Sequence, residues 1–389
     1  MTKLAENTRT ATKAAIKRAS AKSRAAMNRY DREILERLTE LYKEARIDLA
    51  DVISSYADGE ETLRLEVLQE LLQQINQRIE QLAQARDLLL INDGLQYGIE
   101  RGLEPFIGAI DGPALSRVAD EALRFTINHQ MNDGLKLSDR LWRNTSQAKR
   151  VIGNAISQAV IQGHSASQAA QDFISRGVTV PRDVQQQING SNAFRVARVA
   201  GDQLMKAEGN PYYNAKRLFR TEINRAHIEA FRNSSFEHSD VIGTRFLLSN
   251  RHPKPDICDM HARVNRFGLG PGVYPKGKSP LPAHPNTLSY EEAVFADEVS
   301  EEDKNGKQTR IEWLKKQPSH VQQGVLGSNK KRAALHSDLL KENQIATPWK
   351  VLKVRYSKEG VDVDSLSVVS EPIDQPGGLK RSVDEVRVE

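Results

Sequence analysis

The chain has 389 residues, enough for two or three domains, and its composition is 39% hydrophobic, 28% charged and 6% aromatic. Such a composition is typical of a soluble, helix-rich protein with modest cores. No apolar run approaches the roughly 18 residues that a membrane span requires, and the basic N-terminus lacks the apolar stretch of a secretory signal. A single cysteine excludes an internal disulfide framework and suits a reducing compartment.

Residues 1–29 form a basic arm. The first 30 residues contain eight Lys and Arg residues against the single acid Glu6, whereas residues 31–70 contain twelve acids and five bases. Few large apolar residues accompany this positive charge, so we expect an arm that is disordered, or helical only when bound. It would either contact nucleic acid phosphates or remain a solvated tail. The bases expected to contact DNA are Lys13, Lys17, Arg18, Lys22 and Arg24.

Residues 30–93 have the periodicity of a helical hairpin or coiled coil. Apolar residues from Ile34 to Tyr56 recur at three- and four-residue intervals, and the turn at Asp58-Gly59 would end this helix. The second helix has a heptad repeat formed by Leu68, Ile75, Leu82 and Leu89. Because Gln and Arg occupy the other faces, we expect a long, solvated pair of helices. Its broad apolar stripe indicates a surface used in assembly.

A helical domain is expected over residues 114–235, after a break rich in Gly and Pro between Gly94 and Pro113. Its helices are expected at 114–132, 137–163, 165–177, 193–207 and 213–235. The turn at Gly163-His-Ser165 resembles that of a helix-turn-helix, but Arg176 is the only base of the second helix, which disfavours DNA reading.

One later helix carries a polar face. Arg220, Asn224 and His227 lie at positions i, i+4 and i+7, so they share one side of the helix. This side is either solvated or packed against the loop module that follows.

That module lies between Leu248 and Tyr290 and holds three of the nine His, seven of the fifteen Pro and the only Cys. The density of turn residues predicts a loop-rich module, entered by a short strand at 244–249. The spacing Cys258-x-x-His261 resembles half of a zinc site. The candidate metal ligands are His252, Asp256, Cys258, His261 and His284.

Three interpretations of this cluster stay open. Zinc requires about four converging donors, yet Thr287 and Ser289 stand where thiolates would complete the set. The residues also resemble those of a small metal-assisted nuclease, in which His284 would activate water. The third interpretation, which we favour, is a proline-ordered loop whose polar side chains hydrogen-bond to the backbone. In that case the protein has no catalytic residue and no cofactor.

The C-terminal part is expected to contain short helices near 313–318 and 321–327, and about ten more helical positions in 328–350. The alternation from Trp349 to Tyr356 predicts a strand. The remaining residues form an acidic tail, so that residues 336–389 would hold a short helix, a strand and this tail.

The central motifs resemble a known family. The runs His252-Pro-Lys-Pro-Asp256-Ile-Cys258-Asp, Gly268-Leu-Gly-Pro-Gly-Val-Tyr-Pro-Lys276 and Pro-Ala-His284-Pro-Asn286 are similar to the core of phage minor head, or head-morphogenesis, proteins typified by the F protein of phage Mu. The helix with Arg220-Thr-Glu222 and the segment Trp313 to Gly327 resemble the flanking parts. The resemblance covers roughly residues 140–335. In the family, Cys-x-Cys usually follows the His-Pro-Asn step.

The helical periodicity and the turn-rich loops predict a mainly α fold with a small, loop-rich α+β module. The resemblance implies that residues 236–335 form the Mu-F-like domain. It also implies a minor capsid protein of the virion, assembled in the host cytoplasm and bound near the portal. The expected partners are the portal protein, the major capsid protein and phage DNA bound without sequence preference, with no membrane involved. Such a protein aids head assembly and DNA packaging or ejection. The alternatives are a metal-assisted nuclease and a DNA-binding protein that acts during packaging.

Overall fold

The computed structural model describes residues 3–130, 133–206, 209–250, 252, 254–285, 287–363 and 366. The fold is mainly helical with one small antiparallel sheet, which confirms the expected fold class. The chain divides into two compact units: unit 1 comprises Met1–Pro253 and His261–Lys307, and unit 2 comprises Lys254–Met260 and Gln308–Glu389. These boundaries differ from the five segments expected from the sequence. Among the described residues, no helix is long and apolar enough to cross a membrane.

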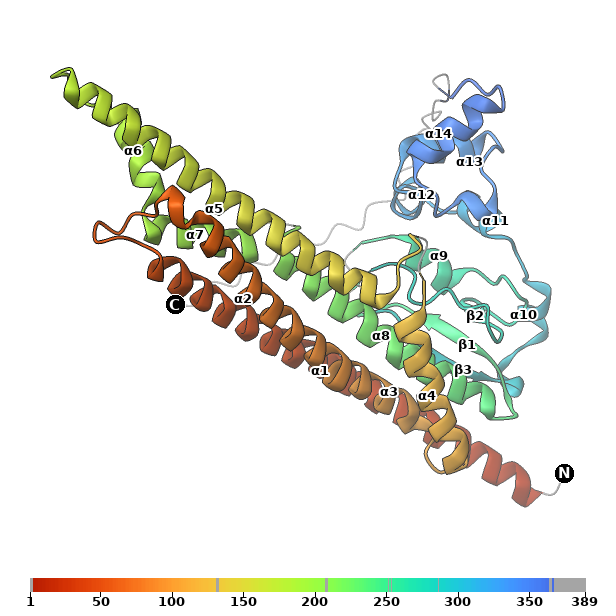
Figure 1. The fold of residues 1–389 in the computed structure, drawn as a ribbon. Coiled ribbons are helices and arrows are strands. Elements are labelled where there is room, and N and C mark those ends of the chain that lie inside the picture. The colour runs from red at the N-terminus through yellow and green to blue at the C-terminus, as the bar shows by residue number, and fades with distance from the viewer. Residues whose placement is uncertain are drawn as a thin grey trace, which may run out of the picture. The chain divides into compact units, whose positions relative to one another are not determined.

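Unit 1 is built on long helices (Figure 1). In chain order its helical elements are α1 (Lys3–Ser55), η1 (Leu65–Val67), α2 (Leu68–Leu88), the π-helical η2 (Leu89–Leu95), α3 (Gln96–Leu103), η3 (Glu104–Phe106), α4 (Gly112–Asn128), α5 (Leu137–Ser175), α6 (Arg182–Ile188), η4 (Asn189–Ser191), α7 (Ala193–Met205), α8 (Pro211–Glu237), η5 (Ala296–Glu298) and α10 (Glu301–Asn305). Helix α9 (Ile257–Arg263) contains the boundary between the units.

The sheet of unit 1 has the strand order β2-β1-β3, with β1 (Val241–Leu247) in the centre, β2 (Val273–Tyr274) and β3 (Tyr290–Phe295). Both pairings are antiparallel, and Thr244 lies opposite Tyr274 on one side and Ala293 on the other. Strand β1 overlaps the strand expected at 244–249, but it begins three residues earlier and ends at Leu247. The sheet packs against α8, the preceding helix in the chain.

The main core of unit 1 lies where α1, α2, α5, α7 and α8 pack together. Leu71 and Ile75 on α2 are fully buried in it, and Leu82 is almost fully buried. The expectation of a solvated hairpin with an exposed assembly stripe is therefore wrong. The broad apolar stripe covers two neighbouring helices of the same chain, because α2 packs against both α1 and α5.

The basic arm is the beginning of α1, which continues without a break from Lys3 to Ser55. The expectation of a disordered or binding-induced arm is therefore wrong. Ile16 is 1% exposed and lies in a second core with Phe106, Phe231 and Phe295. Small residues let the arm approach its neighbours, and the hydroxyl of Ser23 donates to the carbonyl oxygen of Arg101 at 2.5 Å.

The glycine-rich segment after residue 93 is helical rather than a break. Gly94, Gly98 and Gly102 recur every four residues and face α8. A Cβ atom at Gly98 would lie 2.7 Å from the carbonyl oxygen of Ile223, so only glycine permits this approach. The glycines allow α3 and α8 to pack with their backbones close together, and the chain turns only after Phe106.

Helix α5 also runs through its expected turn, because Gly163 lies inside it. A Cβ atom there would lie 2.4 Å from the Cβ atom of Ser191, so this glycine too marks a close contact. The helix-turn-helix interpretation is therefore wrong, since no turn separates the two expected helices.

Unit 2 contains four helices after residue 307 within its described residues: α11 (Arg310–Lys315), α12 (Ser319–Leu326), α13 (Asn329–His336) and α14 (Trp349–Lys358), with the short η6 (Glu342–Gln344) between the last two. The strand expected at 349–356 is wrong. Leu352 and Tyr356 are buried, whereas Val351 and Val354 are about half exposed, which is a helical pattern. Most of the expected acidic tail, from residue 367, lies outside the described residues.

Candidate functional site

Helix α8 carries several of the polar contacts that hold segment 279–291 of unit 1. It begins at Pro211, and the side chain of Asn210 caps it by accepting a hydrogen bond from the backbone N–H of Tyr213 at 2.7 Å. One side of the helix packs on α3 and another on the sheet. Several of its polar residues are therefore buried, among them Glu222, Arg225 and His227.

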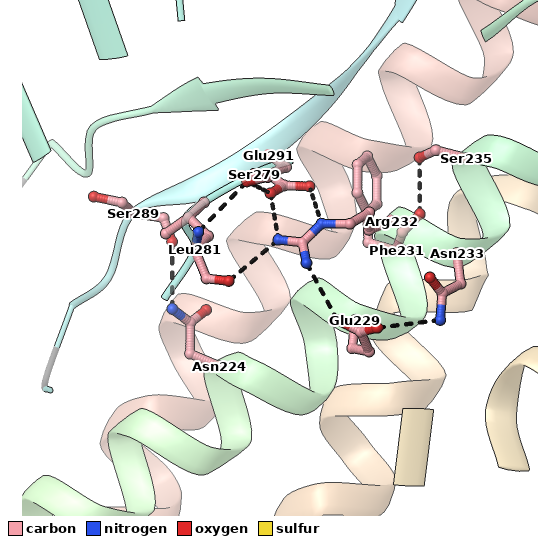
Figure 2. A network of polar contacts seen from close by, with 10 residues as sticks. All are labelled: Asn224, Glu229, Phe231, Arg232, Asn233, Ser235, Ser279, Leu281, Ser289 and Glu291. Carbon is pink, nitrogen blue, oxygen red and sulfur yellow. Dashed lines mark hydrogen bonds and ion pairs between the residues drawn. The ribbon is translucent and has the colours of Figure 1, made fainter. Parts of the chain in front are cut away.

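The strongest of these contacts is a buried ion pair between Arg232 on α8 and Glu291 on β3 (Figure 2). The guanidinium donates from Nη2 to Oε1 at 2.7 Å and from Nε to Oε2 at 3.2 Å, a bidentate geometry. It also donates to Oε2 of Glu229 at 3.2 Å and to the carbonyl oxygen of Leu281 at 3.2 Å. The hydroxyl of Ser279 donates to the same Glu291 carboxylate.

Two carboxylates share this one guanidinium in a buried place. Burial raises the pKa of Glu229 above its usual range, although the charge of Arg232 opposes the rise. Burial alone would lower the pKa of Arg232, but Glu291 and Glu229 raise it above its ordinary value. The guanidinium of Arg232 thus lies between two carboxylates and joins segment 279–291 to α8. The polar groups of these three side chains bond to one another.

The polar face predicted at Arg220, Asn224 and His227 packs against protein. Arg220 binds Asp31 of α1 at 3.0 Å. Asn224 donates from Nδ2 to the carbonyl oxygen of Thr287 at 3.1 Å and to that of Ser289 at 3.3 Å. Of the two readings left open by the sequence, packing against the loop module is therefore correct for Asn224.

His227 is the most deeply placed of the three. Its Nε2 atom lies 3.3 Å from the hydroxyl of Ser23, and burial lowers its pKa to about 4. A small cavity of about 40 Å³ is lined by His227, Asn224 and Arg24, among others. This volume suits about one water molecule, so it offers no room for a substrate.

The five predicted metal ligands are divided between the two units. Asp256 and Cys258 belong to unit 2, where the carboxylate of Asp256 caps the start of α9 by accepting from the backbone N–H of Cys258 at 2.6 Å. The three histidines belong to unit 1. Among the described residues, neither unit by itself brings three potential ligands within reach of one another. The zinc site therefore stays a prediction.

Two of these histidines have protein partners within unit 1. His261 is buried, and its Nδ1 atom lies 3.2 Å from the hydroxyl of Tyr274. The Nδ1 atom of His284 lies 2.9 Å from the carbonyl oxygen of Pro285. His252 is partly buried and is held in a turn, where its N–H donates to the carbonyl oxygen of Ser249 at 2.9 Å. Asn286 of the motif lies outside the described residues.

Thr287 and Ser289 are both buried. The hydroxyl of Thr287 accepts from the backbone N–H of Ser289 at 3.2 Å. Together with the two hydrogen bonds from Asn224, this gives the segment a fixed shape through polar contacts alone.

Four of the five bases predicted to bind DNA contact other residues of unit 1. Lys13 pairs with Asp297 at 3.0 Å and with Glu298 at 3.2 Å, and Lys17 pairs with Glu298. The guanidinium of Arg24 lies 4.1 Å from the ring centroid of Tyr290, and Nζ of Lys22 lies 4.0 Å from Oε1 of Glu104. Arg18 is exposed. The positive charge of the arm is thus partly matched by acids of its own unit.

The sequence reasoning missed a second basic region. A cleft with a volume of about 540 Å³ lies between α5 and α8 and is lined by four arginines, namely Arg140, Arg143, Arg150 and Arg217. Its acids are Asp133 and Glu222. The spacing of Arg140, Arg143 and Arg150 places them on one side of a continuous helix. This spacing was visible in the sequence as a possible basic surface.

In comparisons with protein-family models, curated proteins and solved structures, none matches the chain. The resemblance to phage minor head proteins therefore stays a prediction carried by the motifs.

Proposed function

We propose that this chain is a structural protein of a phage head: a minor capsid protein that binds near the portal and aids head assembly and DNA packaging or ejection. The motifs between His252 and His284 suggest this role. The observation that supports it best is the buried Arg232–Glu291 pair, because it holds the loop segment of the motif rigidly on α8.

The polar residues of this region have structural tasks that suit a scaffold. Arg232 pairs with both Glu229 and Glu291, and Asn224 donates to the backbone of segment 287–289. A hydrolytic site needs a nucleophile or a base directed at an open cleft. Around segment 279–291, Arg232, Glu229 and Asn224 of α8 are bonded to protein groups, which supports a structural role for this region.

The long helices also suit a structural role, because they give the protein a stiff body. Helix α5 spans 39 residues, or roughly 60 Å at about 1.5 Å per residue, and packs along α2, α7 and α8. A protein that positions other subunits in a large assembly needs a stiff body of this kind.

The test is co-sedimentation of the purified chain with purified portal protein and, separately, with major capsid protein. We expect the chain to move with the portal in a sucrose gradient and an unrelated helical protein of similar mass to stay at the top. Failure to move with either partner would contradict the proposal.

The rival nuclease is tested in parallel by incubating plasmid DNA with the chain in magnesium, manganese or zinc. We expect no metal-dependent cleavage. Cleavage that His284→Ala abolishes, while the variant keeps its melting temperature, would replace the structural role with an enzymatic one.

A further inference from the structure

The cleft between α5 and α8 carries a row of guanidinium groups. Arg140, Arg143 and Arg150 occupy positions i, i+3 and i+10 of α5, and Arg217 of α8 lines the same cleft. Ten residues of helix rise by about 15 Å. Successive phosphates of one DNA strand rise by about 3.4 Å along the duplex, so the row is long enough to follow about four of them.

The floor of the cleft is fixed before any ligand arrives. Gln147 donates to the carbonyl oxygen of Gly209 at 2.8 Å and accepts from Asn214 at 2.8 Å. Asn144 donates to the carbonyl oxygen of Pro211 at 2.8 Å. These amides join α5 to the start of α8, so the two helices need no rearrangement when a ligand binds.

The charges of the cleft leave two arginines for a ligand. Arg140 and Arg143 share Asp133, at 2.6 and 3.8 Å, and the carboxylate of Glu222 is paired with Arg225 at 3.0 Å. Arg150 and Arg217 are exposed, and within the described part of the chain neither forms an ion pair. The carboxylate of Asp133 shows how an oxyanion is held between guanidinium groups here.

We propose that this cleft binds the phosphate backbone of DNA without reading its sequence, through Arg150 and Arg217 and then Arg143. The inference rests on the proposed function for the source of that DNA, and the binding itself does not depend on head assembly. A row of cations separated by helix turns fits an extended polyanion better than a single phosphate. The arm is the weaker candidate, because Lys13 and Lys17 are already paired with Asp297 and Glu298.

The experiment measures binding of the purified full chain to a fluorescent 20-base-pair duplex by anisotropy, as a function of salt. The variant is Arg150→Gln with Arg217→Gln. The matched control is Arg32→Gln with Arg78→Gln, which removes the same charge from exposed positions on α1 and α2 outside the cleft. A second variant, Arg150→Lys with Arg217→Lys, keeps the charge. Exposed substitutions of this kind change stability little, and circular dichroism verifies it.

We expect the glutamine pair in the cleft to weaken binding on the order of tenfold or more, and the log–log salt slope to become shallower by about two. The control pair should retain the slope within about one unit of the wild type, and the lysine pair should retain most of it. Binding should be similar for duplexes of different sequence. Head incorporation plays no part in this assay, so its failure and the failure of the proposed function are separate results.

Several outcomes would overturn the inference. They are the absence of DNA binding by the wild-type chain, an equal loss in the control pair, and a loss confined to Lys13→Gln with Lys17→Gln, which would place the contact on the arm. Tighter binding of a polyglutamate peptide than of DNA would assign the cleft to an acidic protein segment. Displacement of the duplex by millimolar inorganic phosphate at constant ionic strength would reduce the site to one for a single phosphate.

Discussion

Arg232 of α8 and Glu291 of β3 meet in a bidentate ion pair whose carboxylate is fully buried. The pair joins a helix to a strand about sixty residues later in the chain, and Glu229 lies beside it. Breaking such a pair is costly, because the remaining charge stays buried without compensation.

The first prediction is that Arg232→Ala lowers the free energy of unfolding of unit 1 by about 3–5 kcal/mol, since Glu229 and Glu291 lose their shared cation. Urea denaturation measures it. Arg117→Ala is the matched control, because its ion pairs with Glu237 and Glu121 lie at the surface, and its cost in stability should be far smaller. Equal effects of the two substitutions would show that the buried pair has no special role.

The second prediction concerns the glycines that face α8. A Cβ atom at Gly102 would lie 2.5 Å from the carbonyl oxygen of His227, so Gly102→Ala should destabilise by about 1–3 kcal/mol or more. Gly153→Ala is the control inside another helix, where the nearest atom lies at 3.8 Å. It should stabilise by about 0.5–1 kcal/mol, because alanine favours helices. Thermal melts of both variants give the comparison, and a stabilised Gly102→Ala would contradict the packing described.

These glycines show where sequence reasoning reached its limit. The fold class, β1 and the helices near α7 and α8 followed from periodicity and turn residues. Gly98 and Gly163 were interpreted as breaks, because a glycine in a helical pattern indicates either a break or a close contact. Only the residue that packs against the glycine distinguishes a close contact from a break. For Gly98 that residue is Ile223, which lies 125 residues later in the chain. The same holds for Ile16, whose burial depends on Phe295 at the far end of the unit.

The candidate site was predictable in part. The shared face of Arg220, Asn224 and His227 followed from helix geometry, and Asn224 does hold the loop backbone. Arg232 and Glu291 were missed, because nothing in the local sequence distinguishes a buried Arg–Glu pair from two solvated charges. Arg140, Arg143 and Arg150 were also missed, because arginines on one face of a helix are equally typical of a solvated surface, and Arg217, which lines the same cleft, lies on another helix.

The third prediction concerns acid stability. The folded pKa of His227 is about 4, against 6.5 for the ordinary group. Between these values the unfolded chain binds more protons, so stability falls as pH drops from about 6.5 to 4. His227→Gln lacks this titration. Between pH 7 and pH 4.5 the wild type should lose about 2 kcal/mol more than the variant, by urea denaturation at both pH values. Parallel losses would mean that His227 is not held neutral.

The fourth prediction is that the loop module requires no metal. Thr287 and Ser289 are buried and bonded to the backbone or to each other, so the segment has a fixed shape without an ion. A chelator should leave the melting temperature unchanged, and elemental analysis should find well below one zinc per chain. Stoichiometric zinc together with unfolding on chelation would contradict this and would restore the metal-based interpretations.

The most direct test of the proposed structural role is quantitative mass spectrometry of purified proheads and mature heads, produced from the source of this chain. The account predicts that the chain is present in both, in few copies relative to the major capsid protein, and that it remains after washing in high salt. Its absence from both proheads and mature heads would contradict the account.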